Sequence, residues 1–599
     1  MIPNLSLTAL RDAYRNGDTT PAQVVADIAR RTADYEQHNI WIHRLSDAEL
    51  APYLARLDDM DPATHPLWGV PFAIKDNIDL AGIPTTAACP AFAYTPDKSA
   101  QVVEQLLAAG AIPIGKTNLD QFATGLVGSR SPYGACANAF NPDYISGGSS
   151  AGSAVAVALG LASFSLGTDT AGSGRVPAAF NNLVGVKPTR GLLSASGMLP
   201  ACQSLDCMTI FALNCDDAAE LLASAEGEDA GDPYSRRNPF SNRARHYGPW
   251  QGPLRVGVID EQQLKFFGDG HYAEAYALAL QRLSDAGIEM VTIDYTAFDE
   301  TARLLYEGPW VAERYIATYP LIVEQPDAFL PVTYGIIEPG GRANAVDLFK
   351  AQYRLEALKK QAYAIMDTVD CLLTPTAGRL FTLAEVAEEP VKRNSELGYY
   401  TNYMNLLDLS ALAIPAGFTG TDLPFGITLV GKTFEDRKLL GIGAYLQQVL
   451  PSLQGASHDP CPPSTMAPQR QTSTIPVVVC GAHLEGLPLN WQLRERGAQL
   501  LERTTTSDGY RLYALAGGPP YRPGLVRDEA GSAIEVEVWS VPAENFGSFV
   551  AGIPSPLGIG KVRLADGREL PGFICEPAGI EGAVEITQLG GWRAYLDQG

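Results

Sequence analysis

The sequence has no excess of positive charge. Of its 599 residues, 44 are Lys or Arg and 67 are Asp or Glu, so the formal net charge is −23. The negative charge is spread along the chain, since residues 475–599 hold 10 basic and 15 acidic residues. A diffuse negative surface repels phosphates, which argues against nucleic acid and anionic membrane as partners. A small anion in a local basic pocket remains compatible with this charge.

Cysteine is scarce, and long apolar runs are missing. The nine cysteines are odd in number and form no CxxC pair, which argues against a disulfide framework and a zinc ribbon. Residues 149–166 carry no charge, but they are mainly Ala, Gly and Ser, which partition weakly into lipid. The N-terminal segment has the pattern of a charged amphipathic helix and lacks the apolar stretch of a signal peptide. We therefore expect a cytoplasmic protein with free thiols.

Apolar runs alternate with helical stretches over about the first 450 residues, which is typical of α/β layers. A polar, Pro-rich stretch follows, and after it the sequence becomes strand-rich. We predict a catalytic domain over 1–455 with a helical cap-like region at about 300–370, a linker over 456–474, and a small α+β domain over 475–599. The predicted strands are 69–74, 111–114, 254–258, 289–293, 371–375, 411–415 and 425–430, then 475–480, 510–516, 533–540 and 561–564.

The most unusual stretch is residues 146–174, which hold seven Ser, seven Gly and one charged residue. A flexible linker does not fit, because residues 154–161 form an apolar run with helical spacing. A Gly/Ser loop, an apolar helix and a second Gly/Ser loop suit a catalytic cradle, since glycines allow close backbone approach and serines supply nucleophiles. Residues 148–152 also match the G-x-S-x-G string of α/β-hydrolases. No apolar strand precedes them, however, as a nucleophile elbow requires.

Ordered blocks of sequence resemble the amidase signature family. They are 70–77 (VPFAIKDN), 115–118 (GKTN), 147–153 (GGSSAGS), 167–178 (GTDTAGSGRVPA) and 184–189 (VGVKPT). The resemblance implies an α/β fold with a central mixed sheet flanked by helices. It also implies a Ser–cis-Ser–Lys triad, with Ser173 as nucleophile, Ser149 as bridging serine and Lys75 as base. The family spacing between the two serines selects Ser149 over its neighbour. The implied oxyanion hole consists of the N–H groups of residues Thr170, Ala171, Gly172 and Ser173.

The implied triad makes physical sense only if its lysine is neutral. A charged ammonium accepts no proton, so Lys75 must be desolvated, and the apolar run before it offers a way to bury it. We expect Ser150 and Ser153 to cap the following helix. Asp169 is expected to orient the nucleophile loop, and Arg175 to hold that loop by ion pairing.

Two further regions resemble the allophanate hydrolase family, and this resemblance covers the whole chain. They are 305–315 (LYEGPWVAERY) and, in the last domain, 480–490 (CGAHLEGLPLN) with 553–560 (IPSPLGIG). The family converts allophanate (N-carboxyurea) to ammonia and N-carboxycarbamate, which then loses carbon dioxide. By the match, Tyr306 and Arg314 bind the substrate carboxylate, for which an Arg fork is well suited. The alternative for Arg314 is a surface ion pair with Glu307 or Glu313.

The C-terminal domain contains one further candidate site residue, a histidine. His483 follows an apolar strand, and the resemblance links it to decarboxylation; a turn histidine satisfied by local backbone is the alternative. The domain also resembles the γ-glutamylcyclotransferase fold in outline.

The sequence also leads to expectations about metals, cofactors and partners. We expect no metal and no cofactor, because metal-ligand spacing, phosphate loops and a biotinyl-lysine segment are all missing. Urea carboxylation would then come from a separate urea carboxylase, and the resemblance suggests a homodimer. Three alternatives remain open: an amidase for another small carboxylated amide such as malonamate, a non-catalytic scaffold, and a transamidating subunit. Whether the pathway degrades urea or s-triazines and biuret is not readable.

Overall fold

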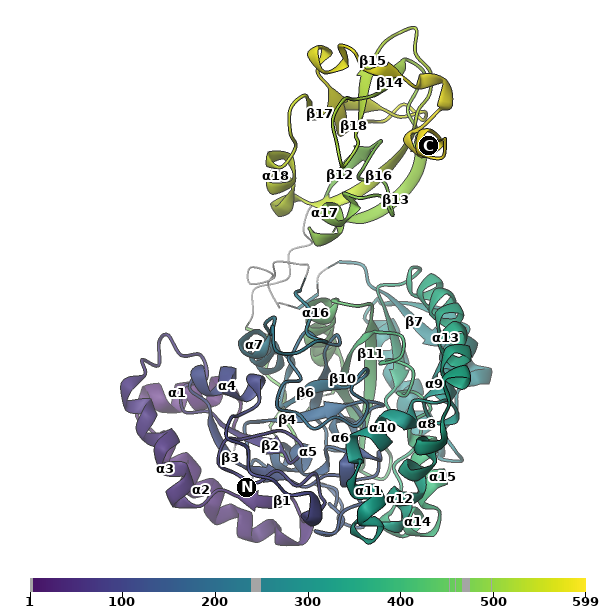
Figure 1. The fold of residues 1–599 in the computed structure, drawn as a ribbon. Helices are drawn as coiled ribbons and strands as arrows, with labels where there is room; N and C mark the ends of the chain where they lie inside the picture. The colour runs from purple at the N-terminus through teal and green to yellow at the C-terminus, as the bar shows by residue number, and fades with distance from the viewer. Residues whose placement is uncertain are drawn as a thin grey trace. The chain divides into compact units, whose positions relative to one another are not determined.

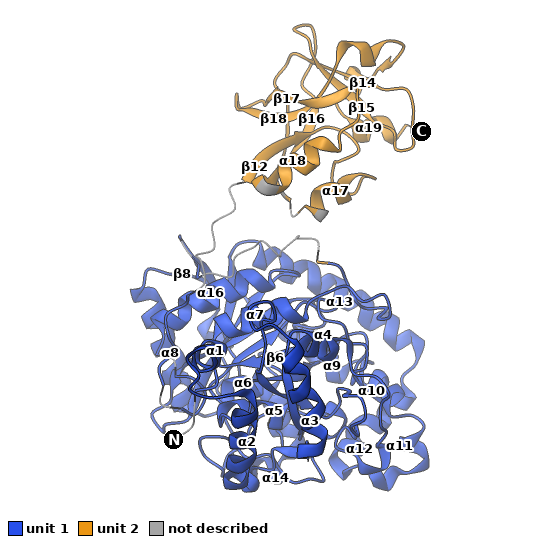
Figure 2. Cartoon of the chain, turned by 90° about the vertical axis from the view of Figure 1, so that its left-hand side faces the viewer, with its two compact units in different colours: residues 1–237, 245–469 blue, residues 238–244, 470–599 orange. Residues whose placement is uncertain are grey.

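The computed structural model describes residues 4–238, 249–250, 252–451, 453–457, 459–465, 474–496 and 498–598. The chain divides into two compact units, 1–237 with 245–469 and 238–244 with 470–599 (Figure 2). Residues 458 and 466–473 of the expected linker lie outside the described residues. No helix of the described residues is long and apolar enough to cross a bilayer.

The first unit is built on a mixed sheet of eleven strands flanked by helices (Figure 1). Its central strands (71–75, 164–169 and 207–212) are fully buried, although polar residues such as Lys75 and Asp169 occur among their apolar ones. In sheet order the strands are β1 (Trp41–Arg44), β3 (Ile112–Thr117), β2 (Pro71–Lys75), β4 (Phe164–Asp169), β6 (Cys207–Ala212), β5 (Val184–Lys187), β10 (Ser410–Phe418), β11 (Pro424–Gly431), β9 (Cys371–Pro375), β7 (Arg255–Ile259) and β8 (Glu289–Ile293). The strands predicted in this unit are all present, and β1, β4, β5 and β6 were not predicted.

Several helices begin at a residue whose side chain caps the first turn. Thr20 and Ser46, for example, each form a capping box with the residue three positions on. The helices of the first unit are α1 (Leu7–Asn16), α2 (Pro21–Thr32), α3 (Asp47–Arg56), α4 (Gln101–Ala108), α5 (Ala151–Ala158), α6 (Val176–Phe180), α7 (Cys215–Ala225), α8 (Gly270–Asp285), α9 (Thr296–Glu307), α10 (Val311–Thr318), α11 (Leu321–Glu324), α12 (Pro331–Ile337), α13 (Ala345–Met366), α14 (Leu383–Glu388), α15 (Pro390–Leu397) and α16 (Asp436–Val449). The region from α9 to α13 is the helix-rich segment that the sequence indicated.

The second unit contains a five-stranded and a three-stranded sheet around its own apolar core. The first sheet has the order β13 (Gln499–Thr505), β16 (Glu535–Pro542), β12 (Thr474–Val479), β18 (Glu569–Cys575) and β17 (Leu557–Arg563). The second has the order β15 (Pro523–Arg527), β14 (Tyr510–Ala514) and β19 (Val584–Glu585), and the helices are α17 (Asn490–Glu495), α18 (Ala543–Ala551) and α19 (Trp592–Leu596). Trp539 is the largest fully buried side chain of this core.

Candidate active site

Lys75 ends β2 in the interior of the large sheet, with β3 on one side and β4 on the other. Its side chain is completely buried, and Nζ donates to Ser149 Oγ at 2.8 Å and to Thr168 Oγ1 at 2.6 Å. Burial disfavours the charged ammonium and lowers the pKa of Lys75 to about 7, although nearby carboxylates act against this. Lys75 therefore has a neutral, proton-accepting form near neutral pH. Thr168, which lies in β4, was not predicted as part of the site.

Ser149 follows the cis peptide bond Gly148–Ser149. Its carbonyl accepts from the N–H of Asp120 at 3.1 Å, and the Asp120 carboxylate accepts from the N–H of Gly128 at 3.0 Å. A Cβ on Gly148 would lie 2.1 Å from Asp120 Oδ2, so only glycine fits there. The two glycines before the serine thus allow a close packing of loops that holds Ser149 against Lys75.

The prediction that Ser150 and Ser153 cap the next helix is wrong. Ser150 occupies the N-cap position of α5 but makes no capping hydrogen bond, and Ser153 lies within the helix. Ser150 Oγ donates to the carbonyl of Thr168 at 3.2 Å, and Ser153 Oγ donates to the carbonyl of Leu166 at 2.9 Å. Both hydroxyls fasten α5 to β4, because the helix packs directly against this strand and the strand carbonyls accept their hydrogen bonds.

Ser173 lies in the loop that follows β4, and Asp169 and Arg175 hold this loop as expected. The Asp169 carboxylate accepts from the N–H of Gly172 at 2.8 Å and of Gly174 at 3.0 Å, and it forms a fully buried ion pair with Arg175 at 2.8 Å. Burial acts to raise the pKa of Asp169, but the charge and hydrogen bonds of Arg175, the charge of Lys187 and the N–H of Gly174 together outweigh it and keep the pKa below its ordinary value. The loop is therefore fixed by charge-assisted bonds.

Of the four expected oxyanion-hole donors, three are unpaired. The N–H groups of Thr170, Ala171 and Ser173 make no hydrogen bond within the part of the chain that the structure describes, whereas that of Gly172 is bonded to Asp169. Ser173 Oγ likewise has no hydrogen-bond partner among the described residues, and Ser173 is only 3 % exposed. A buried loop with adjacent unpaired N–H groups suits the stabilisation of a developing oxyanion.

Arg314 is a buried cation without a carboxylate partner among the described residues. It extends from α10, is 2 % exposed, and donates to Ala123 O at 3.2 Å, Thr124 Oγ1 at 3.0 Å and Tyr306 Oη at 3.4 Å. It makes no ion pair with any described residue, which rules out the surface pairs considered from the sequence; Glu313 instead accepts from the N–H of Ser204. Because its charge helps to lower the pKa of Lys75, Arg314 belongs to the electrostatic surroundings of the triad.

Tyr306 connects Arg314 with the nucleophile loop. It is half-buried on α9 and packs against a small apolar cluster that includes Ala171 of the loop and Cys202. Its ring lies 5.7 Å from the Arg314 guanidinium carbon. The helical region thus brings a cation and a phenol next to the unpaired N–H groups, which is an arrangement suited to a small anionic amide.

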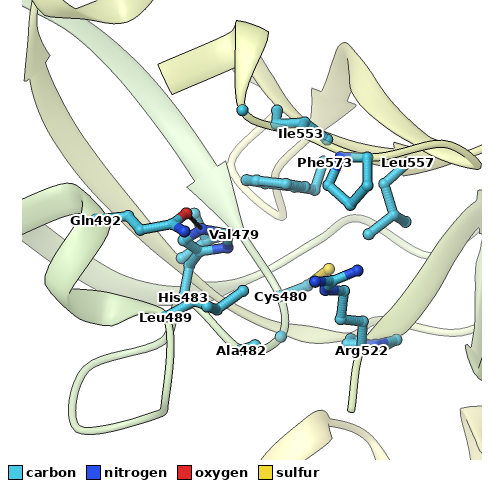
Figure 3. Close-up of a pocket in the computed structure, with 14 residues that line it drawn as sticks. Val479, Cys480, Ala482, His483, Leu489, Gln492, Arg522, Ile553, Leu557 and Phe573 are labelled. Carbon is cyan, nitrogen blue, oxygen red and sulfur yellow. Dashed lines mark hydrogen bonds between the residues drawn. The ribbon is translucent and has the colours of Figure 1, made fainter. Parts of the chain in front are cut away.

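His483 lies in a separate pocket of the second unit (Figure 3). Its ring stacks on Phe573 with centroids 4.9 Å apart, and Nε2 lies 2.9 Å from Gln492 Oε1. Burial is the main reason why the pKa of His483 is lowered, so the ring is neutral near pH 7. The cavity measures about 50 Å³, and both C-terminal segments singled out in the sequence contribute to its walls, including Cys480 and Ile553.

The described residues contain no group of three or more His, Cys, Asp or Glu arranged to hold a metal ion.

Comparison with known proteins agrees with the division of the chain into two units. Residues 23–440 match the model of the amidase family, and residues 475–597 match that of the allophanate hydrolase C-terminal domain. The solved structure of Kluyveromyces lactis allophanate hydrolase is 40% identical, with a TM-score of 0.73 and coverage of 99% of both chains.

Two curated relatives differ in how much of the chain they match. The urea amidolyase of Saccharomyces cerevisiae is 45% identical over 93% of this chain, which spans only 31% of that relative. A glutamyl-tRNA(Gln) amidotransferase subunit from Synechococcus is 33% identical over 71% of this chain and 89% of its own length. The chain belongs to the amidase family, as a hydrolase that carries an allophanate hydrolase C-terminal domain.

Proposed function

We propose that this chain hydrolyses allophanate. The observation that carries the proposal is Arg314, a buried cation with no carboxylate partner among the described residues, which Tyr306 connects with the nucleophile loop. Allophanate presents a carboxylate next to a primary amide, and Arg314 with Tyr306 offers a matching donor pair. The similarity to K. lactis allophanate hydrolase over nearly the whole chain supports the same substrate.

The proposed first reaction proceeds through an acyl-enzyme. Ser173 Oγ attacks the urea carbonyl while its proton passes through Ser149 to neutral Lys75. The oxyanion forms against the unpaired N–H groups of residues 170–173. The proton then returns to the leaving nitrogen, which departs as ammonia. Water, activated through the same serine and lysine, hydrolyses the acyl-enzyme to N-carboxycarbamate and restores the Ser173 hydroxyl.

In the proposed second reaction the C-terminal unit promotes decarboxylation of N-carboxycarbamate. One C–N bond breaks, its electron pair stays on nitrogen, carbon dioxide leaves, and the nitrogen takes up a proton. His483 is the titratable imidazole of the second pocket and is the group we assign to that proton transfer. The resulting carbamate decays to the second ammonia and the second carbon dioxide.

The number of ammonia molecules released per allophanate tests the function. The full chain should turn allophanate over rapidly and yield two ammonia per molecule, with malonamate measured in parallel. Because N-carboxycarbamate also decays spontaneously, His483→Asn is the control: its first ammonia should keep the parent rate, and its second should appear more slowly. Turnover of malonamate but not of allophanate would keep the amidase chemistry and reject the proposed substrate.

Replacing the buried cation should weaken substrate binding. Arg314→Gln is expected to raise KM for allophanate roughly 10- to 100-fold, because charge-assisted hydrogen bonds contribute about 1.5–3 kcal/mol. Arg303→Gln is the matched control, since Arg303 lies on the neighbouring helix α9 with its side chain 55% exposed and should change KM little. Initial rates of ammonia release measure both variants; an unchanged KM in Arg314→Gln would reject the assignment of the carboxylate site.

The lowered pKa of Lys75 predicts the direction of the pH dependence. Below pH 7 the ammonium form dominates and accepts no proton, so kcat/KM should fall about tenfold per pH unit. Above pH 7 the neutral form dominates, and kcat/KM should reach a plateau. A profile of initial rates measures this limb, with its midpoint expected near the pKa of about 7. A rate that stays level from pH 5.5 to 8 would exclude Lys75 as the base.

The remaining proposals concern the oligomeric state of the chain and the source of its substrate. We propose a cytoplasmic homodimer that receives its substrate from a separate urea carboxylase. The similarity to urea amidolyases supports a connection with urea breakdown. Sedimentation of the purified chain tests the dimer.

A further inference from the structure

Arg522 lines the second pocket with a guanidinium group that has no partner among the described residues. It immediately precedes β15, and its Nε is buried yet makes no hydrogen bond to any residue that the structure describes. None of the ion pairs among those residues involves Arg522. Figure 3 shows its side chain extending towards Cys480 on the wall of the pocket. A buried, unpaired donor on a pocket wall is unusual in folded proteins and points to a ligand.

The rest of the pocket has no negative charge to balance this cation. Its described lining includes no Asp and no Glu. Burial raises the pKa of the Cys480 thiol to about 12, so this group is neutral, and the His483 ring is neutral near pH 7. Glu485, two residues after His483 in the chain, is paired with Arg494 and Arg503. The pocket therefore attracts an anion.

The backbone adds unpaired donors to the same wall. The N–H groups of Gly481, Ala482 and His483 make no hydrogen bond in the part of the chain that is described, although all three residues line the pocket. Phe573 and Leu557 cover other parts of the cavity with apolar surface. A guanidinium fork, free N–H groups and an apolar wall around about 50 Å³ suit a small carboxylate.

We propose that Arg522 anchors a carboxylate in this pocket and thereby presents a small dicarboxylate to His483. The inference rests on the proposed function, and it names the residue that selects the substrate of the second reaction. In N-carboxycarbamate one carboxylate would bind Arg522, and the other would leave as carbon dioxide. Arg522 is a positioning residue in this scheme, because it does not itself exchange a proton.

Binding of malonate tests the anchor without any turnover. Malonate carries two carboxylates on one carbon and cannot lose carbon dioxide under assay conditions. The full chain, labelled with 13C at histidine Cε1, has seven histidines, and His483→Asn identifies the signal of His483. Malonate should shift this signal saturably in the parent. In Arg522→Gln the malonate concentration needed for half-saturation should rise at least tenfold.

The matched control is Arg527→Gln, at the other end of β15 from Arg522 and exposed to solvent. It should bind malonate like the parent. If Arg522→Gln fails to fold by circular dichroism, Arg522→Lys replaces it; Lys retains the charge without the fork and should bind several-fold more weakly. Parent-like binding in whichever of these two variants is measured, or a His483 signal that malonate never shifts, would overturn the inference.

Measurements of ammonia release distinguish a failure of the proposed Arg522 anchor from a failure of the proposed function. In Arg522→Gln the first ammonia from allophanate should appear at the parent rate, and only the second should be delayed. If the parent chain does not hydrolyse allophanate, the proposed function fails while the malonate result still decides the anion site. If allophanate is hydrolysed but Arg522→Gln binds malonate normally, the inference alone fails.

Discussion

Ser173→Ala should abolish ammonia release, with kcat falling by roughly 10⁴- to 10⁶-fold. The substitution removes the hydroxyl that the nucleophile loop offers to the substrate, and the acyl-enzyme can no longer form. Because Ser173 Oγ makes no hydrogen bond within the described residues, the loop loses no support, and the thermal midpoint should stay within about 2 °C of the parent value. A coupled assay for ammonia and a melting curve measure the two effects.

Ser153→Ala is the matched control for the nucleophile. Ser153 is also fully buried, but its hydroxyl bonds the carbonyl of Leu166 and lies 2.7 Å from Thr117 Oγ1. Its loss should cost about 1–3 kcal/mol of stability and leave kcat within a few-fold of the parent. The opposite pattern, with activity retained in Ser173→Ala and lost in Ser153→Ala, would reject the assignment of the nucleophile.

Lys75→Met should lower kcat by roughly 10²- to 10⁴-fold, the range for loss of a general base. Methionine fills a similar volume, and it removes the need to desolvate an ammonium group. Stability should therefore be unchanged or slightly higher, although Ser149 and Thr168 each lose one donor. Urea denaturation measured beside the ammonia assay tests this separation of activity from stability.

Lys116→Met provides the contrast, because Lys116 is an equally buried lysine on the neighbouring strand β3. Its Nζ forms an ion pair with Asp76 at 3.0 Å, and both side chains are completely buried. Removing the lysine leaves a buried carboxylate unpaired, which should cost about 3–5 kcal/mol. If Lys75→Met destabilises the chain as much as Lys116→Met does, Lys75 is structural and not the base.

Secondary-structure elements could be predicted from the sequence where their apolar residues follow one another with little interruption. The segment 371–375 was predicted with the bounds of β9. The strand β4 was missed because Ser, Gly and Thr interrupt its apolar pattern, although it lies buried between β2 and β6. In the second unit, β15 and β18 were missed because Pro and Gly, which weaken strand patterns, lie within them.

Contacts within the site were predictable only over short sequence distances. Asp169 and Arg175 are six residues apart, and the expected roles of both in holding the loop are confirmed. Asn405, by contrast, donates to the carbonyl of Asp169 from 236 residues away, and no local pattern indicates it. Arg522 was missed for the same reason, because it approaches the segment of His483 only after the second unit has folded.

The side chains of the two candidate sites come from separate units, and neither site borrows a described residue from the other. Substitutions can therefore alter the described side chains of one candidate site without changing those of the other. The glutamyl-tRNA(Gln) amidotransferase subunits, which match 71% and 64% of this chain, are similar to a part of it and not to the whole. Grafting the second unit onto another amidase is accordingly a rational starting point for building two-step amide-degrading catalysts.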